Sequence, residues 1–146
     1  MVHIFLDIDG VLNKESDWSL KYHVDKNCVK ILKLLIESIK DEVSIVLTST
    51  WKNGYSKDGN HSPQIIKVLE HLREQGLDID DITPITTKGR QEEIEYYIRR
   101  NLVKKYIVLD DDISLFSQPK NIKIYIVDYK KGLTTGDVKK IIKYIK

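Results

Sequence analysis

Short apolar runs that end abruptly at polar residues constrain the fold of this chain more than any other feature of its sequence. Three such runs, with the residue that follows each, are 2–6 with Asp7, 43–47 with Thr48 and 106–109 with Asp110. Apolar runs of this length, bounded by polar residues, predict buried β-strands. Weaker runs at 82–85 and 122–127 predict two further strands.

Stretches with apolar residues at helical spacing separate the expected strands. They are 25–40, 62–75, roughly 90–102 and a C-terminal stretch. Asp25 precedes the first stretch and Ser62 with Pro63 begins the second, as is typical of helix starts. Thr134 and Asp137 form a capping-box pattern before the last stretch. Alternating strands and helices predict a parallel sheet, with ligands bound at the carboxyl ends of its strands.

The expected architecture is therefore a three-layer, Rossmann-like α/β fold, with a central parallel sheet of about five strands and helices on both faces. No repeat or linker interrupts the 146 residues, so we expect one domain over 1–146. The 24 basic and 22 acidic residues nearly balance, which argues against nucleic-acid binding driven by overall charge. No apolar stretch approaches the roughly 20 residues that span a bilayer. We expect a cytoplasmic protein without a membrane partner.

Acidic side chains follow two of the expected strands. Asp7 and Asp9 follow the first strand, and the run Asp110, Asp111 and Asp112 follows the strand at 106–109. A single Asp after a strand often forms only a turn or a helix cap. Two clusters at one sheet edge would repel each other unless a cation compensates them. Because hard oxygen ligands select Mg²⁺, the pattern predicts a magnesium site.

These residues also resemble a known family. FLDIDGVL at 5–12 resembles the DxDGxx signature of the haloacid dehalogenase (HAD) superfamily, and it follows an apolar strand as that family requires. Thr48 resembles the second motif of the family, and Asp110 with Asp111 resembles its acidic fourth motif. The chain is further similar to a small capless phosphatase subgroup, the HAD domain of Swiss Army Knife RNA repair proteins. The segments that carry this similarity are LTSTW at 47–51, RQEEI at 90–94 and GLT at 132–134.

The resemblance implies a Mg²⁺-dependent phosphatase that works through an aspartyl-phosphate. Asp7 would attack phosphorus, while Asp9 would protonate the leaving oxygen and then activate water. An Asp at the second position of the motif favours a phosphatase over a dehalogenase. The implied magnesium ligands are Asp7, Asp9, Asp110 and Asp111, with Asp112 remaining an alternative to Asp111.

Phosphate binding is expected from residues near these carboxylates. Gly10 would let the backbone turn so that amides face the phosphoryl oxygens, and Thr48 would add a hydroxyl donor. The family also supplies a cation before the fourth motif. Arg90 is preferred for this role because it begins the RQEEI segment, and Lys88 is the alternative.

The segment after the second motif is expected to contact substrate through Ser49, Trp51 and Lys52. Trp51 has two interpretations, a platform that stacks on a base or sugar and an ordinary packing residue. Lys52 stands where the subgroup commonly has Arg, which keeps the charge but loses the planar fork. The polar loop 52–61 borders this region, and whether it closes over the site is left open.

The spacing between motifs leaves little room for a cap domain, so an open site is expected. An open site suits a phosphate on a large substrate, and we expect a nucleotide or polynucleotide phosphate end. Two other functions remain open. One is a non-catalytic module that binds phosphate or nucleic acid, and the other is a phosphotransferase that passes the phosphoryl group to an acceptor other than water.

Overall fold

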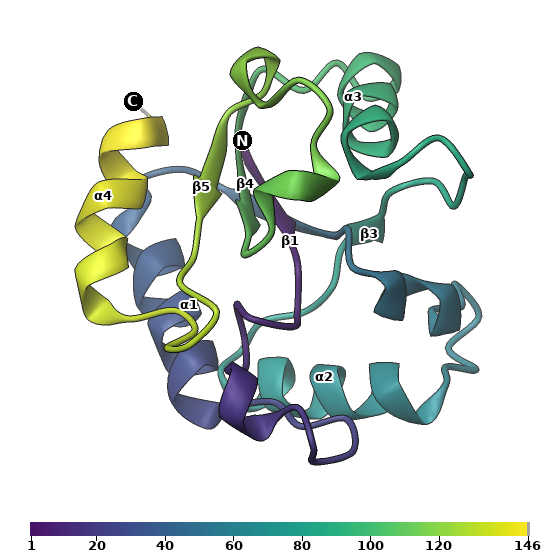
Figure 1. Cartoon of the computed structure of the whole chain (residues 1–146), viewed down its shortest axis with the longest axis vertical. Coiled ribbons are helices and arrows are strands. Elements are labelled where there is room, and N and C mark those ends of the chain that lie inside the picture. Colours follow the sequence, from purple (N-terminus) through teal and green to yellow (C-terminus); the bar gives the residue numbers. More distant parts are fainter. Residues whose placement is uncertain (146) are drawn as a thin grey trace.

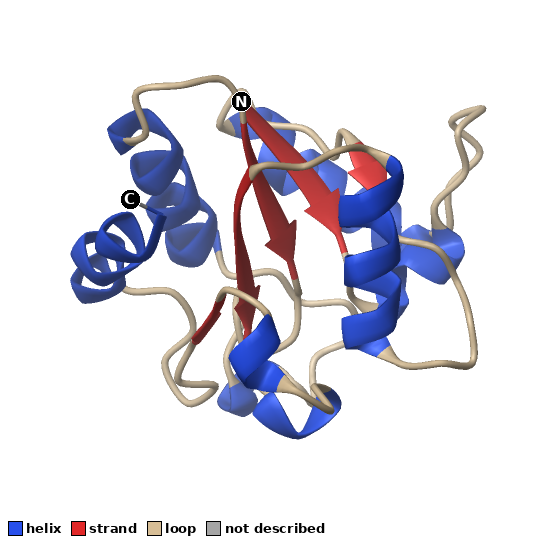
Figure 2. Cartoon of the chain, turned by 90° about the horizontal axis from the view of Figure 1, so that it is seen from above, coloured by secondary structure: helices blue, strands red, loops and turns tan. Residues whose placement is uncertain are grey.

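The computed structural model describes residues 1–145, and its apolar runs form one parallel sheet in the order β3-β2-β1-β4-β5. The strands are β1 (Val2–Leu6), β2 (Val43–Leu47), β3 (Asp81–Ile82), β4 (Lys105–Asp110) and β5 (Ile124–Ile126). Figure 2 shows the central strands running in the same direction between two layers of helices. The five-stranded parallel sheet expected from the sequence is confirmed.

Helices cover both faces of this sheet because successive side chains of each strand point to opposite faces. The helices are α1 (Lys26–Ser38), α2 (Pro63–Glu74), α3 (Arg90–Arg100) and α4 (Thr135–Ile145). Ile4 and Leu6 of β1 pack into a core with α1, α2 and α4, whereas Phe5 packs into a second core with α3. Figure 1 shows α1 and α4 side by side, with α3 on the far side of the strands.

The three-layer α/β fold without a cap domain is therefore confirmed for the described residues. Only short 3-10 helices interrupt the connections between the main elements there, such as η1 (Glu15–Asp17) and η2 (Thr50–Gly54). None of the helices within residues 1–145 has the length and apolar character that crossing a membrane requires.

The helix-start signals lie where the sequence placed them. The carboxylate of Asp25 accepts hydrogen bonds from the amides of Asn27 and Cys28 at the start of α1. Asp137 accepts hydrogen bonds from the amide and hydroxyl of Thr134, which is one half of the expected capping box before α4; the Asp137 amide donates to the carbonyl of Thr134 and not to its hydroxyl. Ser62 occupies the N-cap position of α2, although its side chain makes no capping hydrogen bond.

Two strands are shorter than expected. β3 covers Asp81–Ile82 rather than 82–85, because Pro84 has no N–H group to continue the ladder and its carbonyl accepts a hydrogen bond from a side chain instead. β5 covers Ile124–Ile126 rather than 122–127, since Ile122 still belongs to the end of the preceding 3-10 turn.

The strand register aligns the carboxyl ends of three neighbouring strands. Leu6 of β1 pairs with Leu47 of β2 on one side and with Leu109 of β4 on the other. The polar residues that come next along these strands are Asp7, Thr48 and Asp110. They therefore meet at one edge of the sheet, where a parallel α/β fold binds its ligands.

Candidate active site

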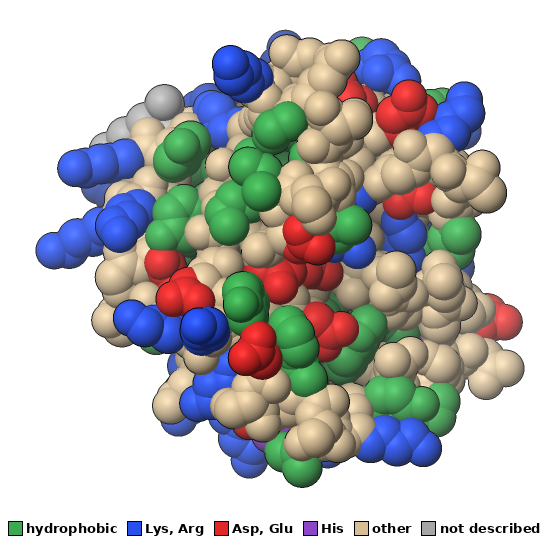
Figure 3. Space-filling model, viewed as in Figure 1, with side chains coloured by type: hydrophobic (Ala, Val, Ile, Leu, Met, Phe, Trp, Pro, Cys, Tyr) green, Lys and Arg blue, Asp and Glu red, His purple; other side chains and the backbone are tan. Residues whose placement is uncertain are grey.

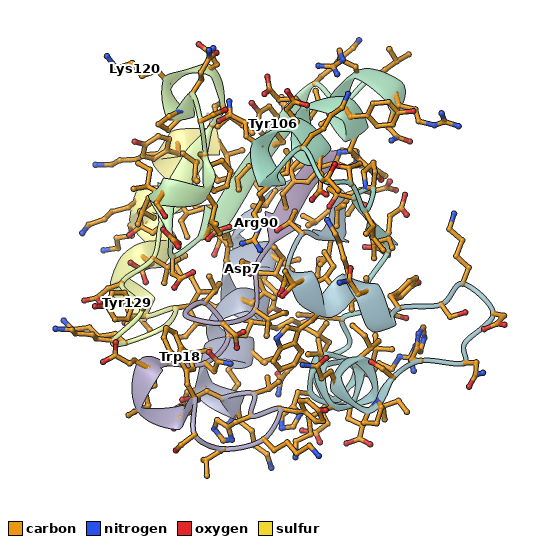
Figure 4. The ribbon with its side chains drawn as sticks, turned by 45° about the vertical axis from the view of Figure 1, so that its right-hand side comes forward. Asp7, Trp18, Arg90, Tyr106, Lys120 and Tyr129 are labelled. Atoms are coloured by element: carbon orange, nitrogen blue, oxygen red, sulfur yellow. The ribbon has the colours of Figure 1, made fainter. Side chains whose placement is uncertain are left out.

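Three carboxylates converge at this edge of the sheet. One oxygen from each of Asp7, Asp110 and Asp111 lies within 4.8 Å of the others. Asp7 is 4% exposed and Asp110 is fully buried. Figure 4 shows Asp7 near the middle of the molecule, and in Figure 3 acidic side chains gather near the centre of the visible face. This cluster is the metal-ligand group that the sequence predicted, except for Asp9.

The charges of this cluster are only partly compensated. Burial, followed by repulsion from Asp110, raises the pKa of Asp7 well above its usual value, and the nearby Arg90 opposes this shift. Burial also raises the pKa of Asp111. A divalent cation would remove this conflict, and three carboxylate oxygens are the hard donors that Mg²⁺ prefers. The donor set therefore fits the ion that the family implies.

Arg90 supplies the cation beside the carboxylates. It is the first residue of α3, and its Nη1 lies 2.8 Å from Oδ2 of Asp110 and 3.4 Å from Oδ1 of Asp7. Burial opposes its charge, but the two carboxylates outweigh that effect and raise the pKa of Arg90. The side chain of Lys88 is exposed and forms no ion pair within residues 1–145. The fold thus brings Arg90, and not Lys88, against the carboxylates.

Asp9 stands outside the acidic cluster. Its Oδ1 accepts a hydrogen bond of 2.9 Å from Nδ2 of Asn13, and its Oδ2 accepts one of 3.1 Å from Nε1 of Trp51. These two donors hold the Asp9 carboxylate apart from Asp7, Asp110 and Asp111 in this structure, and the role of Asp9 as a metal ligand stays a prediction.

Gly10 makes the sharp turn that its position in the motif predicted. Its φ is +81°, a conformation that L side chains rarely adopt. A Cβ atom here would lie 2.4 Å from Oδ2 of Asp111, so the glycine also makes room for that carboxylate. Its amide donates to Oδ1 of Asn13 at 2.8 Å, which means that this N–H group is not free to face a phosphate.

Thr48 has a hydroxyl without a partner. The residue is 1% exposed, and its Oγ1 makes no hydrogen bond with any described residue. It lines a cavity of about 250 Å³ together with Arg90. A buried hydroxyl normally has a hydrogen-bond partner, and a phosphoryl oxygen in this cavity would supply one.

Polar side-chain atoms of Ser49 and Trp51 form hydrogen bonds within the chain, and their expected contacts with substrate stay a prediction. The hydroxyl of Ser49 accepts a hydrogen bond from the Trp51 amide at 3.2 Å and caps η2. Trp51 is only 6% exposed, because its ring packs into the core and its N–H donates to Asp9. Its side chain therefore orients the Asp9 carboxylate and offers no open face for stacking.

The ammonium group of Lys52 forms hydrogen bonds within the protein, and the expected contact of Lys52 with substrate stays a prediction. Its Nζ donates to Oε1 of Glu93 at 2.7 Å, to Oγ1 of Thr83 at 2.8 Å and to the carbonyl of Pro84 at 3.0 Å. These bonds use all three N–H donors of the ammonium group. The Lys52 side chain is 4% exposed, and no donor remains for a phosphate.

The structure separates Asp111 from its alternative, Asp112. The carboxylate of Asp112 caps the 3-10 helix η3 (Ile113–Leu115) by accepting hydrogen bonds from the amide and hydroxyl of Ser114. Its amide donates to Oδ1 of Asp110 at 3.0 Å. Asp112 thus holds the Asp110 carboxylate through its amide, and Asp111 is the residue whose carboxylate joins the cluster.

Within the loop 52–61, the first residues belong to η2 and the rest is held by its own contacts. The amide of Ser56 donates to Nδ1 of His61 at 3.0 Å, and the rings of Tyr55 and His61 lie 4.8 Å apart. Figure 4 shows this segment extending away from Asp7. In this structure the loop does not cover the carboxylates.

Sequence reasoning missed Asn13 and Glu93. Asn13 is 2% exposed and bonds to Asp9, Gly10 and two further groups, yet a single Asn after a turn carries no periodic signal. Glu93 appeared only as part of the RQEEI segment. Its burial on α3 beside Lys52 depends on how α3 packs against η2, which no local pattern reveals.

Comparison with known protein families gives one match. The family model of the HAD domain in Swiss Army Knife RNA repair proteins matches residues 3–138. No curated protein and no solved structure matches the chain. The matched range includes Asp7, Thr48 and Asp110 at the strand ends, and Arg90.

Proposed function

The chain belongs to the family of HAD domains in Swiss Army Knife RNA repair proteins, and from this premise we propose that it is a Mg²⁺-dependent phosphomonoesterase that uses Asp7 as its nucleophile. The observation that carries the proposal is the convergence of Asp7, Asp110 and Asp111 within 4.8 Å, with Arg90 against two of them. A phosphatase needs this combination, because phosphoryl transfer depends on positioning and on stabilising negative charge.

In the first step, an oxygen of the Asp7 carboxylate attacks phosphorus, and the bond from phosphorus to the ester oxygen breaks. The ester oxygen takes the proton of the Asp9 carboxyl group as it leaves. Arg90 stabilises the negative charge on the phosphoryl oxygens, and the unpaired hydroxyl of Thr48 donates to one of them.

In the second step, the Asp9 carboxylate takes a proton from water, and the water oxygen attacks phosphorus. The bond between phosphorus and the Asp7 oxygen breaks, which releases phosphate and restores the carboxylate. Asn13 and Trp51 hold Asp9 in one orientation for both proton transfers.

Asp7, Asp110 and Asp111 would hold the magnesium ion. When bound, the ion neutralises charge on the transferring group. Arg90 already bridges Asp7 and Asp110, so these side chains are held close together before any ion binds.

The proposed substrate is a nucleotide or polynucleotide phosphate end. The support is the open carboxylate edge: no cap domain covers it among residues 1–145, so a large substrate can reach Asp7. The family is named for RNA repair proteins, which is consistent with this class.

The test is phosphate release from an aryl phosphate, from sugar phosphates and from 3′- and 5′-phosphorylated oligonucleotides, each with Mg²⁺ or EDTA. Asp7→Asn should abolish turnover, and EDTA should do the same. Asp78→Asn is the matched control, because Asp78 is an exposed carboxylate paired with Arg73 away from the site.

Each outcome separates the parts of the proposal. Turnover that survives Asp7→Asn would refute the aspartyl mechanism. Activity on sugar phosphates alone would refute the substrate class and leave the enzyme class intact. Transfer of phosphate to added alcohols in place of water would identify a phosphotransferase.

A further inference from the structure

Trp18 presents an exposed aromatic ring close to the candidate site. It directly follows η1 and is 44% exposed, which is unusual for the largest apolar side chain. Its ring stacks on that of Tyr129, with 5.9 Å between centroids and 27° between planes. Tyr129, which follows β5 along the chain, is itself 37% exposed. Two segments far apart in the sequence thus build one exposed aromatic surface.

The indole of Trp18 is fixed to the same side chain that holds Asp9. Its Nε1 donates to Oδ1 of the buried Asn13 at 2.9 Å, while Nδ2 of Asn13 donates to Asp9 at 2.9 Å and to the carbonyl of His23 at 3.0 Å. A ring that is hydrogen-bonded at one end and stacked on one face loses little freedom when a ligand binds. It is therefore suited to recognition.

A cavity of about 230 Å³ joins Trp18 to the acid/base group. Asp9, Asn13, Trp18, Lys21 and His23 are among the residues that line it. The cavity lined by Thr48 and Arg90 is separate from it. In Figure 4, Arg90 lies above Asp7, and Trp18 and Tyr129 lie below it. The two cavities share no lining residue.

From this arrangement we propose that Trp18, supported by Tyr129, is the platform that binds the leaving group, and that this group carries a nucleobase. The inference rests on the proposed phosphatase function, in which Asp9 gives its proton to the leaving oxygen. Whatever is attached to that oxygen must then lie beside Asp9, in the cavity that Trp18 borders. A flat ring with polar edges matches both the indole face and the polar residues around it.

Trp18, and not Trp51, is thus the tryptophan that we expect to stack on a base. Trp51 borders the same cavity but is 6% exposed, whereas Trp18 is 44% exposed. Tyr96 on α3 is 45% exposed and lines cavities with Pro84, away from Asp9, so it offers a control of equal exposure. Replacing Tyr96 tests whether the loss of any exposed aromatic side chain weakens the binding of a nucleotide.

The first experiment measures binding of a nucleoside monophosphate to Asp7→Asn protein by isothermal titration calorimetry in Mg²⁺. Adding Trp18→Ala should weaken binding roughly 5- to 150-fold, which is the range for loss of one base stack. Trp18→Phe should retain most of the affinity, because it keeps an aromatic face and loses only the bond to Asn13. Tyr96→Ala should bind like its parent. No detectable binding by Asp7→Asn, or equal effects of Trp18→Ala and Tyr96→Ala, would overturn the proposal.

The second experiment uses the active enzyme and compares kcat/KM for a nucleoside monophosphate with that for glycerol phosphate. Trp18→Ala should lower the ratio of these two values by a similar factor. An equal loss on both substrates would show that Trp18 acts only through Asn13 and Asp9, and would overturn the inference while leaving the phosphatase assignment intact. Absence of turnover on every phosphate ester would refute the phosphatase assignment, and the binding experiment would still decide the role of Trp18.

Discussion

Replacing Lys52 by Met should destabilise the protein strongly, because the change leaves a buried carboxylate without its cation. Lys52 and Glu93 form an ion pair at 2.7 Å with side chains that are 4% and 10% exposed. Removing one partner of such a pair costs about 3–5 kcal/mol. The change also removes hydrogen bonds to Thr83 and Pro84. The expected loss is a large share of the roughly 5–15 kcal/mol that stabilises a typical domain.

Urea unfolding followed by circular dichroism measures this loss through the unfolding midpoint and slope. Lys52→Met combined with Glu93→Leu should be more stable than Lys52→Met alone, since no unpaired charge then remains. Part of the loss should persist, because Glu93 also accepts hydrogen bonds from Thr86. Lys88→Met is the matched control and should change the unfolding free energy by less than about 0.5 kcal/mol. A Lys52→Met protein of native stability with a raised KM would refute this reasoning and return Lys52 to the substrate site.

Three further predictions concern the carboxylate cluster. Arg90→Met should lower kcat/KM on a phosphate ester about 10²- to 10³-fold, whereas Lys88→Met should leave it nearly unchanged; the reverse order would reassign the cation. The pKa of Asp7 is higher in the folded protein than in the unfolded chain, where it is about 4. In EDTA, the unfolding free energy should therefore fall as the pH rises from about 4 to the pKa of Asp7 in the folded protein. The unfolding free energy of Asp7→Asn minus that of the native protein should therefore grow with pH, and a constant difference would contradict this. Gly10→Ala should destabilise the protein by about 1–3 kcal/mol and weaken Mg²⁺ binding in calorimetry, because φ is +81° and the new Cβ would clash with Asp111; native Mg²⁺ affinity would show that Asp111 does not ligate the ion.

The strand ends were predictable because one physical rule places them. An apolar strand buried on both faces must end where polar residues begin, and parallel strands bring these ends to one edge. This is why Asp7, Thr48 and Asp110 could be brought together from the sequence. The bounds of β3 were not predictable in the same way. The end of β3 depends on Pro84. The carbonyl of Pro84 accepts a hydrogen bond from Lys52, which lies about 30 residues earlier in the chain.

The residues after β2 show where local reasoning stops. Ser49, Trp51 and Lys52 follow a site strand, and position alone suggested that all three contact substrate. The Ser49 hydroxyl caps η2, whereas the side chains of Trp51 and Lys52 turn inward to partners elsewhere in the chain, among them Asp9 and Glu93. Such pairings depend on tertiary packing, so neither spacing nor hydrophobic periodicity could have revealed them.

The surroundings of the two motif carboxylates differ in a way that matches the roles proposed for them. Asp7 faces the Arg90 guanidinium, which opposes the rise in the pKa of Asp7 caused by burial and by Asp110, and so acts toward the charged form that a nucleophile needs. Asp9 is held instead by two neutral N–H groups, from Asn13 and Trp51, and forms no ion pair within residues 1–145. Neutral donors fix the orientation of a carboxyl group without tying it to a permanent positive charge. Side chains from two separate segments thus fix both oxygens of the Asp9 carboxyl group, which gives this group the defined orientation that the proposed proton transfers require.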